Sequence, residues 1–208
     1  MKVKICGITD VETAIASSEY GADAIGFVFA ESKRRVSIDK AKKIASKLPN
    51  EVLKVGVFVN ESRDEIEKIA SVVGLTHIQL HGDETAAFSE SLSLPVIKAI
   101  SFQGNENLEA FGDFPCEYIL LDSPKGKYRG GNGTVFNWGE VNLNMLNHRK
   151  VILAGGLNED NVDEAVNRIR PCMVDVSSGV ETEGKKDLNK IKSFIEKAKV
   201  SLIGGNTK

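Results

Sequence analysis

The chain has 208 residues, of which 41% are hydrophobic and 27% are charged, and its formal net charge at pH 7 is −2. This composition is typical of a soluble globular protein. The small net charge excludes a general attraction to nucleic acid or to an anionic membrane, although a local basic patch can still bind a small anion.

Neither membrane insertion nor export is expected. No apolar run approaches the ~18 residues that a membrane-spanning helix needs, and the opening MKVKICGITD lacks the long apolar core of a signal peptide. We therefore expect a cytoplasmic protein with no membrane partner. The cysteines, Cys6, Cys116 and Cys172, lie far apart without a CxxC motif, and the three histidines are scattered. This spacing favours neither a disulfide framework nor a metal site.

Eight short apolar segments rich in Val and Ile are predicted to be strands. Most are nearly continuous in apolar residues, which is typical of parallel strands covered on both faces. They are residues 3–8, 24–29, 52–59, 77–82, 96–101, 118–123, 151–157 and 173–180.

Helical periodicity fills most of the gaps between these strands. Ser37 is a predicted N-cap, and Ser62 with Glu65 predicts a capping box. The pattern is weaker after the fifth and sixth strands, where residues 106–111 form at most two turns. The clear helical segments are residues 10–21, 37–48, 62–74, 158–169 and 186–198.

This order of elements predicts one α/β domain, a (β/α)₈ TIM barrel over residues 1–200. No composition shift or linker divides the chain. A doubly wound open sheet is the alternative, since it also alternates strands with helices. Residues 201–208 are expected to form a disordered C-terminal tail.

In such barrels the site lies at the carboxyl ends of the strands. Side chains alternate along a strand, so the apolar pair Val3 and Ile5 should face the outer helices, which turns Lys4 and Cys6 inward. Cys6 would then lie at the rim of the site, and the alternative is an inert core thiol. Asp122 likewise points inward at the end of its strand, unless it is an N-cap or loop carboxylate.

Deeper in the barrel, Asp175 on the last strand faces inward. The first and last strands become neighbours when the barrel closes, so Asp175 and Lys4 would form a buried ion pair. We therefore interpret Asp175 as structural and Asp122 as chemical.

Two glycine-containing turns follow consecutive strands, at Gly155-Gly156 and at Ser177-Ser178-Gly179. The first turn precedes the predicted helix 158–169, and together the turns resemble the phosphate site that follows the seventh and eighth strands of many barrels. The basic run SKRR at residues 32–35 is either a solvated charge run or an anion contact. His81 is either a substrate contact or a hydrogen-bonding residue of the rim.

The chain resembles the phosphoribosylanthranilate isomerase family from about residue 2 to residue 199. KICGIT and VDVSSGVE are highly specific in combination. The stretches that carry the resemblance are KVKICGIT, GADAIGFVFAESKRRVS, VGVFVN, IQLHGDE, LLD, GGNG, LAGGLN and PCMVDVSSGVE-GKKD.

The resemblance implies a (β/α)₈ barrel without cofactor or metal that performs an Amadori rearrangement on a phosphosugar in tryptophan biosynthesis. It implies that Cys6 is the general base and Asp122 the general acid. It also implies that Arg34 holds the carboxylate of the substrate and that the turns at Gly155-Gly156 and Ser177-Ser178-Gly179 bind its phosphate. The sequence is compatible with a monomer or a homodimer.

One stretch departs from the family pattern GG-[ST]-G-K-x-F-D-W. This chain reads GGNGTVFNW at residues 130–138, with Thr134 in place of the usual lysine and Asn137 in place of the usual aspartate. The departure leaves the acid–base pair unchanged but is expected to alter the charge of a loop near the site.

Two other functions compete. Another phosphosugar barrel enzyme, such as an epimerase or the aminoaldose isomerase of histidine synthesis, would share the phosphate site, but the histidine enzyme usually uses two aspartates. A non-enzymatic phosphate binder would need only the turns and the arginine. The thiol, acid and arginine together argue against both.

Overall fold

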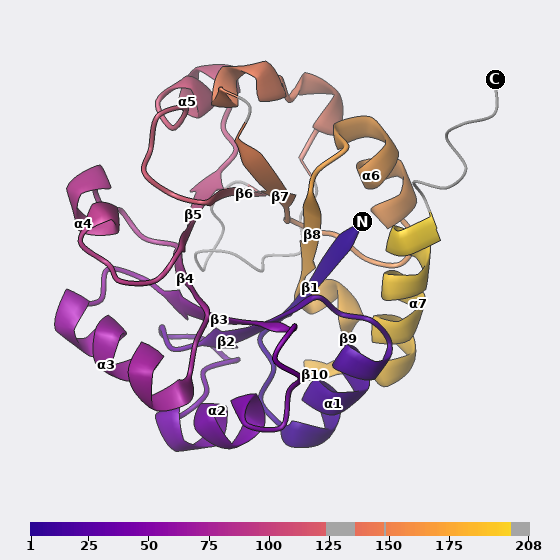
Figure 1. Ribbon diagram of the computed structural model, residues 1–208. Helices are drawn as coiled ribbons and strands as arrows, with labels where there is room; N and C mark the ends of the chain where they lie inside the picture. The colour runs from indigo at the N-terminus through magenta and orange to yellow at the C-terminus, as the bar shows by residue number, and fades with distance from the viewer. Residues whose placement is uncertain (124–135, 148, 201–208) are drawn as a thin grey trace.

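The computed structural model describes residues 1–123, 136–147 and 149–200. Its eight main strands form one closed parallel barrel in the order β1 to β8, and Figure 1 looks along the barrel with the helices outside. Pairing of β1 with β8 excludes the open sheet, which would leave both as edges. The predicted tail at 201–208 lies outside the described residues.

Seven of the eight barrel strands are shorter than the apolar segments that predicted them, and β5 has the predicted bounds. The bounds are β1 (Lys2–Cys6), β2 (Ala24–Val28), β3 (Leu53–Phe58), β4 (His77–Leu80), β5 (Val96–Ser101), β6 (Tyr118–Asp122), β7 (Lys150–Leu153) and β8 (Met173–Val176). The remaining apolar residues continue into the loops at the carboxyl ends of the strands.

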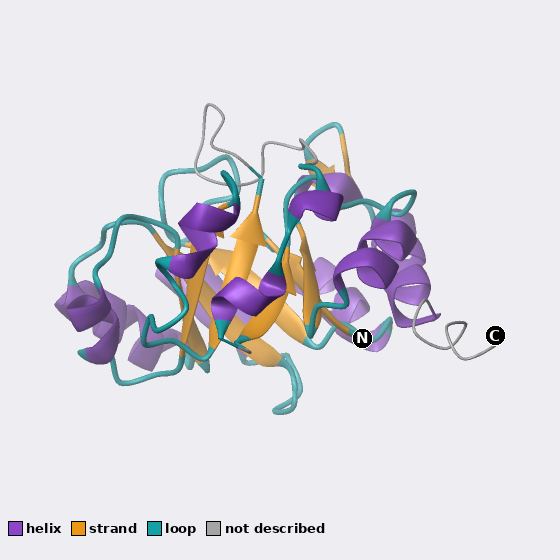
Figure 2. Ribbon diagram, turned by 90° about the horizontal axis from the view of Figure 1, so that it is seen from above, coloured by secondary structure: helices purple, strands orange, loops and turns teal. Residues whose placement is uncertain are grey.

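Helices surround these strands, as Figure 2 shows from another direction. The α-helices are α1 (Val11–Glu19), α2 (Ile38–Ala45), α3 (Arg63–Val73), α4 (Ala86–Glu90), α5 (Asn105–Glu109), α6 (Val162–Ile169) and α7 (Leu188–Val200). Three 3₁₀ helices, η1 (Trp138–Glu140), η2 (Leu143–Leu146) and η3 (Ser178–Val180), and the hairpin β9 (Glu181–Thr182) with β10 (Lys185–Lys186) complete the described elements.

The local sequence explains where most helices start, and the structure corrects the sequence prediction at two places. The Ser37 and Ser62 hydroxyls accept the backbone N–H of the residue three positions on, at 3.4 Å in both cases. The capping box at Ser62 is half formed, because the Glu65 carboxylate pairs with Lys68 instead. After β6 the described residues form the short η1 and η2, whose N-cap asparagines hydrogen-bond the backbone locally and favour turns over a long helix.

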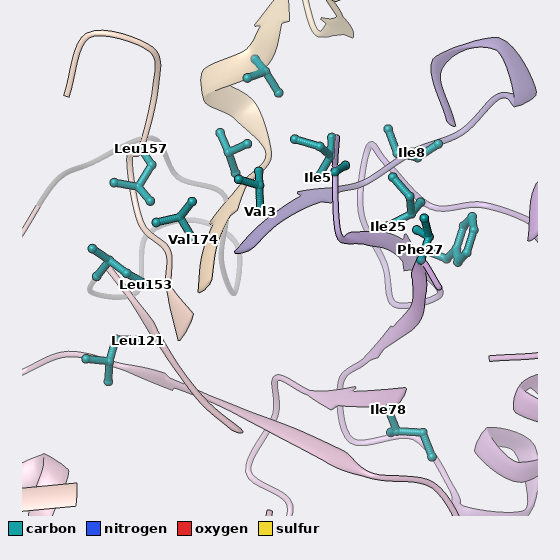
Figure 3. Packing of buried hydrophobic residues seen from close by; sticks show 14 of the residues in the cluster. Val3, Ile5, Ile8, Ile25, Phe27, Ile78, Leu121, Leu153, Leu157 and Val174 are labelled. Carbon is teal, nitrogen blue, oxygen red and sulfur yellow. The ribbon is translucent and has the colours of Figure 1, made fainter. Parts of the chain in front are cut away.

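Strand alternation divides the core into two layers. Apolar residues on the outer face of the strands pack against the helices, and Figure 3 shows this layer for Val3, Ile5, Ile25 and Val174. A second cluster fills the barrel. Its buried members are Ala24, Val55, Ile97, Ala99, Tyr118, Leu120, Ile152, Ala154 and Met173. Val3 and Ile5 therefore point outward, as predicted.

The barrel closes where β1 and β8 pair. Lys4 lies opposite Asp175 in the register, and Lys4 Nζ is 2.9 Å from Asp175 Oδ1, with the Lys4 side chain fully buried. The predicted ion pair is confirmed. Burial alone would lower the pKa of Lys4, but the Asp175 carboxylate reverses this, and the pKa of Lys4 is raised above its ordinary value.

Across residues 1–123, 136–147 and 149–200, we find no helix with the length and apolar character that a membrane crossing requires.

Removing the buried ammonium should destabilise the barrel. Lys4→Met leaves the Asp175 carboxylate buried without its partner, so we expect the free energy of unfolding to fall by about 3–5 kcal/mol. Urea unfolding, followed by the fluorescence of the single tryptophan, measures this. Lys2→Met, on an exposed position of the same strand, is the matched control and should change stability by no more than about 0.5 kcal/mol. Equal stability of the two variants would contradict a structural role for the pair.

Candidate active site

A cavity of about 860 Å³ opens at the carboxyl ends of the barrel strands. It unites residues that lie far apart in the sequence, as the barrel architecture requires. Its wall contains every predicted site residue except Gly179: Cys6, Arg34, His81, Asp122, Gly155, Gly156, Ser177 and Ser178.

Cys6 is the last residue of β1 and is buried with 8% of its surface exposed. It pairs with Gly26 on β2. A Cβ atom on Gly26 would lie 2.8 Å from the Cys6 Sγ and 3.2 Å from the Lys4 Nζ. Glycine at this position therefore leaves room for the thiol and the ammonium group to lie side by side at the wall of the cavity.

Opposing charges surround this thiol. Burial raises the pKa of Cys6 above its ordinary value, and the ammonium groups of Lys4 and Lys186 act in the opposite direction without reversing the shift. The Asp175 carboxylate raises the pKa further. The resting protein therefore holds Cys6 as a neutral thiol near pH 7, while two buried cations stabilise the thiolate once the proton has left. Desolvation is the larger effect.

Asp122 ends β6 with its carboxylate on the cavity wall and 4% of the residue exposed. Its Oδ1 accepts the backbone N–H of Ser123 at 2.8 Å. Its Oδ2 lies 3.4 Å from the Nε2 of His81. The backbone thus fixes one oxygen, and the other oxygen is left beside the imidazole.

His81 follows β4 and lines the same cavity. Its Nδ1 lies 3.4 Å from the Nε2 of Gln79 on the barrel interior. Its buried Nε2 has no hydrogen-bond partner among the described residues and faces Asp122. His81 therefore lies beside the Asp122 carboxylate and is also part of the rim of the cavity.

The two glycine-containing turns pack against the rest of the rim. Gly155 and Gly156 have φ values of 82° and 66°, in the region that favours glycine. A Cβ on Gly155 would lie 2.5 Å from the Ser123 backbone nitrogen. A Cβ on Gly179 would overlap the carbonyl oxygen of Leu157, so Gly179 joins the two turns from behind the cavity wall.

The helix next to these turns differs from the prediction. α6 begins at Val162 rather than at residue 158. The side chain of Asn161 accepts the N–H of Asn158 at 2.9 Å and donates to the carbonyl of Gly156 at 3.0 Å, which holds a turn before the helix. The helical N–H groups nearest to the cavity belong instead to η3, directly after β8, where many barrels bind phosphate.

Arg34 lines the cavity, and its guanidinium forms a bidentate ion pair with Glu181. Arg34 Nε lies 2.6 Å from Glu181 Oε1, and Arg34 Nη2 lies 2.8 Å from Oε2. The arginine side chain crosses Gly7, where a Cβ would lie 2.6 Å from Arg34 Cδ and where φ is 78°. The glycine that follows Cys6 is therefore required by both the backbone and the arginine.

Sequence reasoning missed Glu181 and Lys186. Lys186 Nζ donates to Glu181 Oε1 and to the Ser177 carbonyl, both at 2.8 Å, with 5% of its side chain exposed. Both residues lie within VDVSSGVE-GKKD, one of the stretches that carry the family resemblance. This resemblance was the signal in the sequence that could have identified them. Their burial depends on the β9–β10 hairpin, which brings them back toward the loop after β2.

The structure describes only part of the stretch at residues 130–138 that departs from the family pattern. Asn137 accepts the Gly139 backbone N–H at 3.0 Å and donates to Glu140 Oε1 at 2.8 Å, and so caps η1. Asparagine and aspartate both suit this position. Thr134 lies outside the described residues.

Comparison with known proteins gives a consistent result. The family model for N-(5′-phosphoribosyl)anthranilate isomerase matches residues 3–197. A relative of that name from Bacillus cereus is 57% identical, covering 96% of this chain and 98% of the relative. The structure of phosphoribosyl anthranilate isomerase from Thermotoga maritima has a TM-score of 0.87 and 43% identity, covering 96% and 98% of the two chains.

An isomerase structure in complex with reduced 1-(o-carboxyphenylamino)-1-deoxyribulose 5-phosphate has a TM-score of 0.83 and 42% identity, covering 96% of this chain and 98% of that one.

The buried thiol should ionise late. Because its pKa is raised, the thiolate fraction should grow with pH only above the range of a free thiol, whose pKa is about 8.5. Alkylation by iodoacetamide over a pH series, with the Cys6 peptide quantified by mass spectrometry, measures this separately from Cys116 and Cys172. Glutathione in the same series is the reference. A half-maximal rate for Cys6 at or below the pH found for glutathione would contradict the prediction.

Proposed function

The chain belongs to the N-(5′-phosphoribosyl)anthranilate isomerase family, and we propose that it converts N-(5′-phosphoribosyl)anthranilate into 1-(2-carboxyphenylamino)-1-deoxyribulose 5-phosphate by an Amadori rearrangement. It is an isomerase of tryptophan biosynthesis. The observation that carries the proposed chemistry is the presence of a thiol and a carboxylate, from Cys6 and Asp122, on the wall of one cavity beside glycine-containing turns. The cytoplasmic location expected from the sequence stays a prediction.

The first step would open the sugar ring. Asp122 in its protonated form would donate to the furanose ring oxygen, the C1–O bond would break, and the nitrogen lone pair would form a protonated imine. Two contacts support this role. The Ser123 N–H holds one carboxyl oxygen, while the other oxygen lies beside His81 Nε2 at the cavity. For His81, both predicted roles, a substrate contact and a hydrogen-bonding residue of the rim, stay open.

The second step would move a carbon-bound proton. Cys6 would first release its thiol proton to solvent. As the thiolate, it would then remove the proton from C2 of the sugar, and the electron pair of the broken C–H bond would neutralise the imine to give an enolamine, which tautomerises to the ketone. Lys4 and Lys186 support this step because their charges favour the thiolate. The low-dielectric surroundings strengthen such interactions when substrate excludes water.

The two charged ends of the substrate would be held by separate groups. The turns at Gly155-Gly156 and Ser177-Ser178-Gly179 would bind the phosphate through backbone N–H groups. Their place supports this, because four of these five residues line the cavity and η3 starts at the second turn. Arg34 would hold the anthranilate carboxylate, for which the planar guanidinium is suited. The proton donor and the base would then flank the sugar between these anchors.

The proposed reaction is tested by incubating the purified chain with N-(5′-phosphoribosyl)anthranilate and, separately, with the aminoaldose of histidine synthesis. We expect turnover of the first compound and complementation of a tryptophan auxotroph that lacks this isomerase. Turnover of the second compound alone, or of neither, would reject the proposal.

Replacing either proton-transfer group should slow chemistry more than binding. Cys6→Ala and Asp122→Asn are each expected to lower kcat by about 10²–10⁴ with little change in KM, because a general acid or base contributes that much to the rate. Steady-state kinetics on the first substrate measure both constants. Near-normal turnover in one variant would remove that residue from its assigned role.

The arginine should have the opposite kinetic signature. Arg34→Ala removes a charge-assisted contact with the substrate carboxylate, so KM should rise by about ten- to a hundredfold, the effect expected when a hydrogen bond to a charged group is lost. The same kinetic assay measures it. An unchanged KM would mean that the carboxylate binds elsewhere.

A further inference from the structure

We propose that Glu181 is a positioning residue that holds Arg34 so that the free edge of its guanidinium receives the carboxylate of the substrate. The inference rests on the proposed function and deepens it, because it assigns to Glu181 and to the β9–β10 hairpin a part in substrate recognition.

The geometry of the guanidinium supports this role. Arginine carries five N–H donors in one plane, and a carboxylate can take two of them along one edge. Glu181 takes the edge formed by Nε and Nη2, at 2.6 and 2.8 Å. The remaining edge is formed by Nη1 and the second hydrogen of Nη2. Because the Arg34 side chain lines the cavity, this edge is left for a ligand.

Glu181 is itself held in place. Lys186 Nζ contacts Glu181 Oε1 at 2.8 Å, and Lys190 Nζ donates to the Glu181 backbone carbonyl at 3.0 Å. Only 9% of the Glu181 side chain is exposed. On the opposite side, Arg34 rests on Gly7. The braced carboxylate therefore holds the guanidinium, and the backbone beside Cys6 supports the aliphatic part of the Arg34 side chain.

The charges around Arg34 favour a second anion. Arg34 and Lys186 share the single carboxylate of Glu181. Burial raises the pKa of Glu181, but the hydrogen bond from Arg34 and the charge of Lys186 outweigh this and hold its pKa below the ordinary value. Burial lowers the pKa of Lys186, and the Glu181 carboxylate acts in the opposite direction. Glu181 thus stays ionised beside Arg34 and holds only one edge of its guanidinium.

The opposite interpretation is that Glu181 occupies the place of the substrate carboxylate and must be displaced. The burial of Glu181 and its second partner, Lys186, argue against displacement, because leaving would strand Lys186 in a buried site. The two interpretations predict opposite effects on affinity when Glu181 is replaced.

The test compares Glu181→Gln with the wild-type chain, using reduced 1-(o-carboxyphenylamino)-1-deoxyribulose 5-phosphate as the probe in isothermal titration calorimetry. Glutamine keeps the shape but can accept only one of the two arginine hydrogen bonds. We expect Kd of the probe and KM of the substrate to rise by about ten- to a hundredfold. The value of kcat should change less than about threefold, because Glu181 contacts neither of the proposed proton-transfer groups. Glu183→Gln, an exposed position of the same hairpin, is the matched control and should bind the probe as the wild type does.

A double-mutant cycle separates positioning from an independent effect. In an Arg34→Ala background, Glu181→Gln should leave Kd nearly unchanged, because its action depends on the arginine. Tighter or unchanged binding by Glu181→Gln alone would overturn the proposal. Equal weakening of probe binding by Glu181→Gln in the wild-type chain and in the Arg34→Ala background would also overturn it.

Two further measurements keep the outcome interpretable. Glu181→Asp retains the negative charge but moves it back by one methylene group. It should therefore weaken binding of the probe less than Glu181→Gln does, even if Glu181→Gln has the lower Tm. Equal weakening by the two variants would overturn the positioning role. Inhibition by inorganic phosphate should change much less than binding of the probe, because no residue of the phosphate turns is replaced, and a parallel loss would overturn a carboxylate-specific role. Failure of the proposed function itself would appear separately, as lack of turnover by the wild-type chain.

Discussion

Closure of the barrel between β1 and β8 is the constraint on which the rest of the structure depends. It places Lys4 opposite Asp175 across the seam, where each buried charge requires the other. The same closure sets the end of β1, with Cys6, beside the loop after β8. Ser177 Oγ donates to the Cys6 carbonyl at 3.1 Å across this junction. The stability of the fold and the surroundings of the thiol therefore have one common origin.

The site is built by combining burial with compensating charge. Desolvation keeps the Cys6 thiol protonated, and Lys4 and Lys186 limit that effect. The raised pKa keeps the thiolate fraction of Cys6 small at neutral pH, and the two ammonium groups make the thiolate less unfavourable than burial alone would. The Arg34–Glu181 pair extends the charge network from the thiol to the place proposed for the substrate carboxylate. A change in one member of this network is expected to affect its neighbours.

Close backbone approach is the second structural device of the rim. Gly7 admits the Arg34 side chain, Gly26 admits the thiol, and Gly155 and Gly179 bring the turns after β7 and β8 against neighbouring backbone. A side chain at any of these four positions would displace a group on or next to the cavity wall. The glycines therefore act through packing as well as through conformational freedom, which links turn chemistry directly to the geometry of the site.

The sequence by itself determined the strand–helix alternation, the inward direction of Lys4, Cys6 and Asp122, and the positions of the glycine-containing turns. Each follows from local periodicity, which the chain carries in consecutive residues. Helix starts were less well predicted, because asparagine side chains compete for backbone hydrogen bonds before α6 and in η1 and η2. Only the tertiary structure decided that Arg34 pairs with Glu181, that Lys186 is buried near the thiol, and that desolvation dominates the pKa of Cys6. Those outcomes depend on contacts between residues far apart in the sequence, 147 positions for Arg34 and Glu181, and on how much water the folded chain excludes, neither of which is encoded in any local pattern.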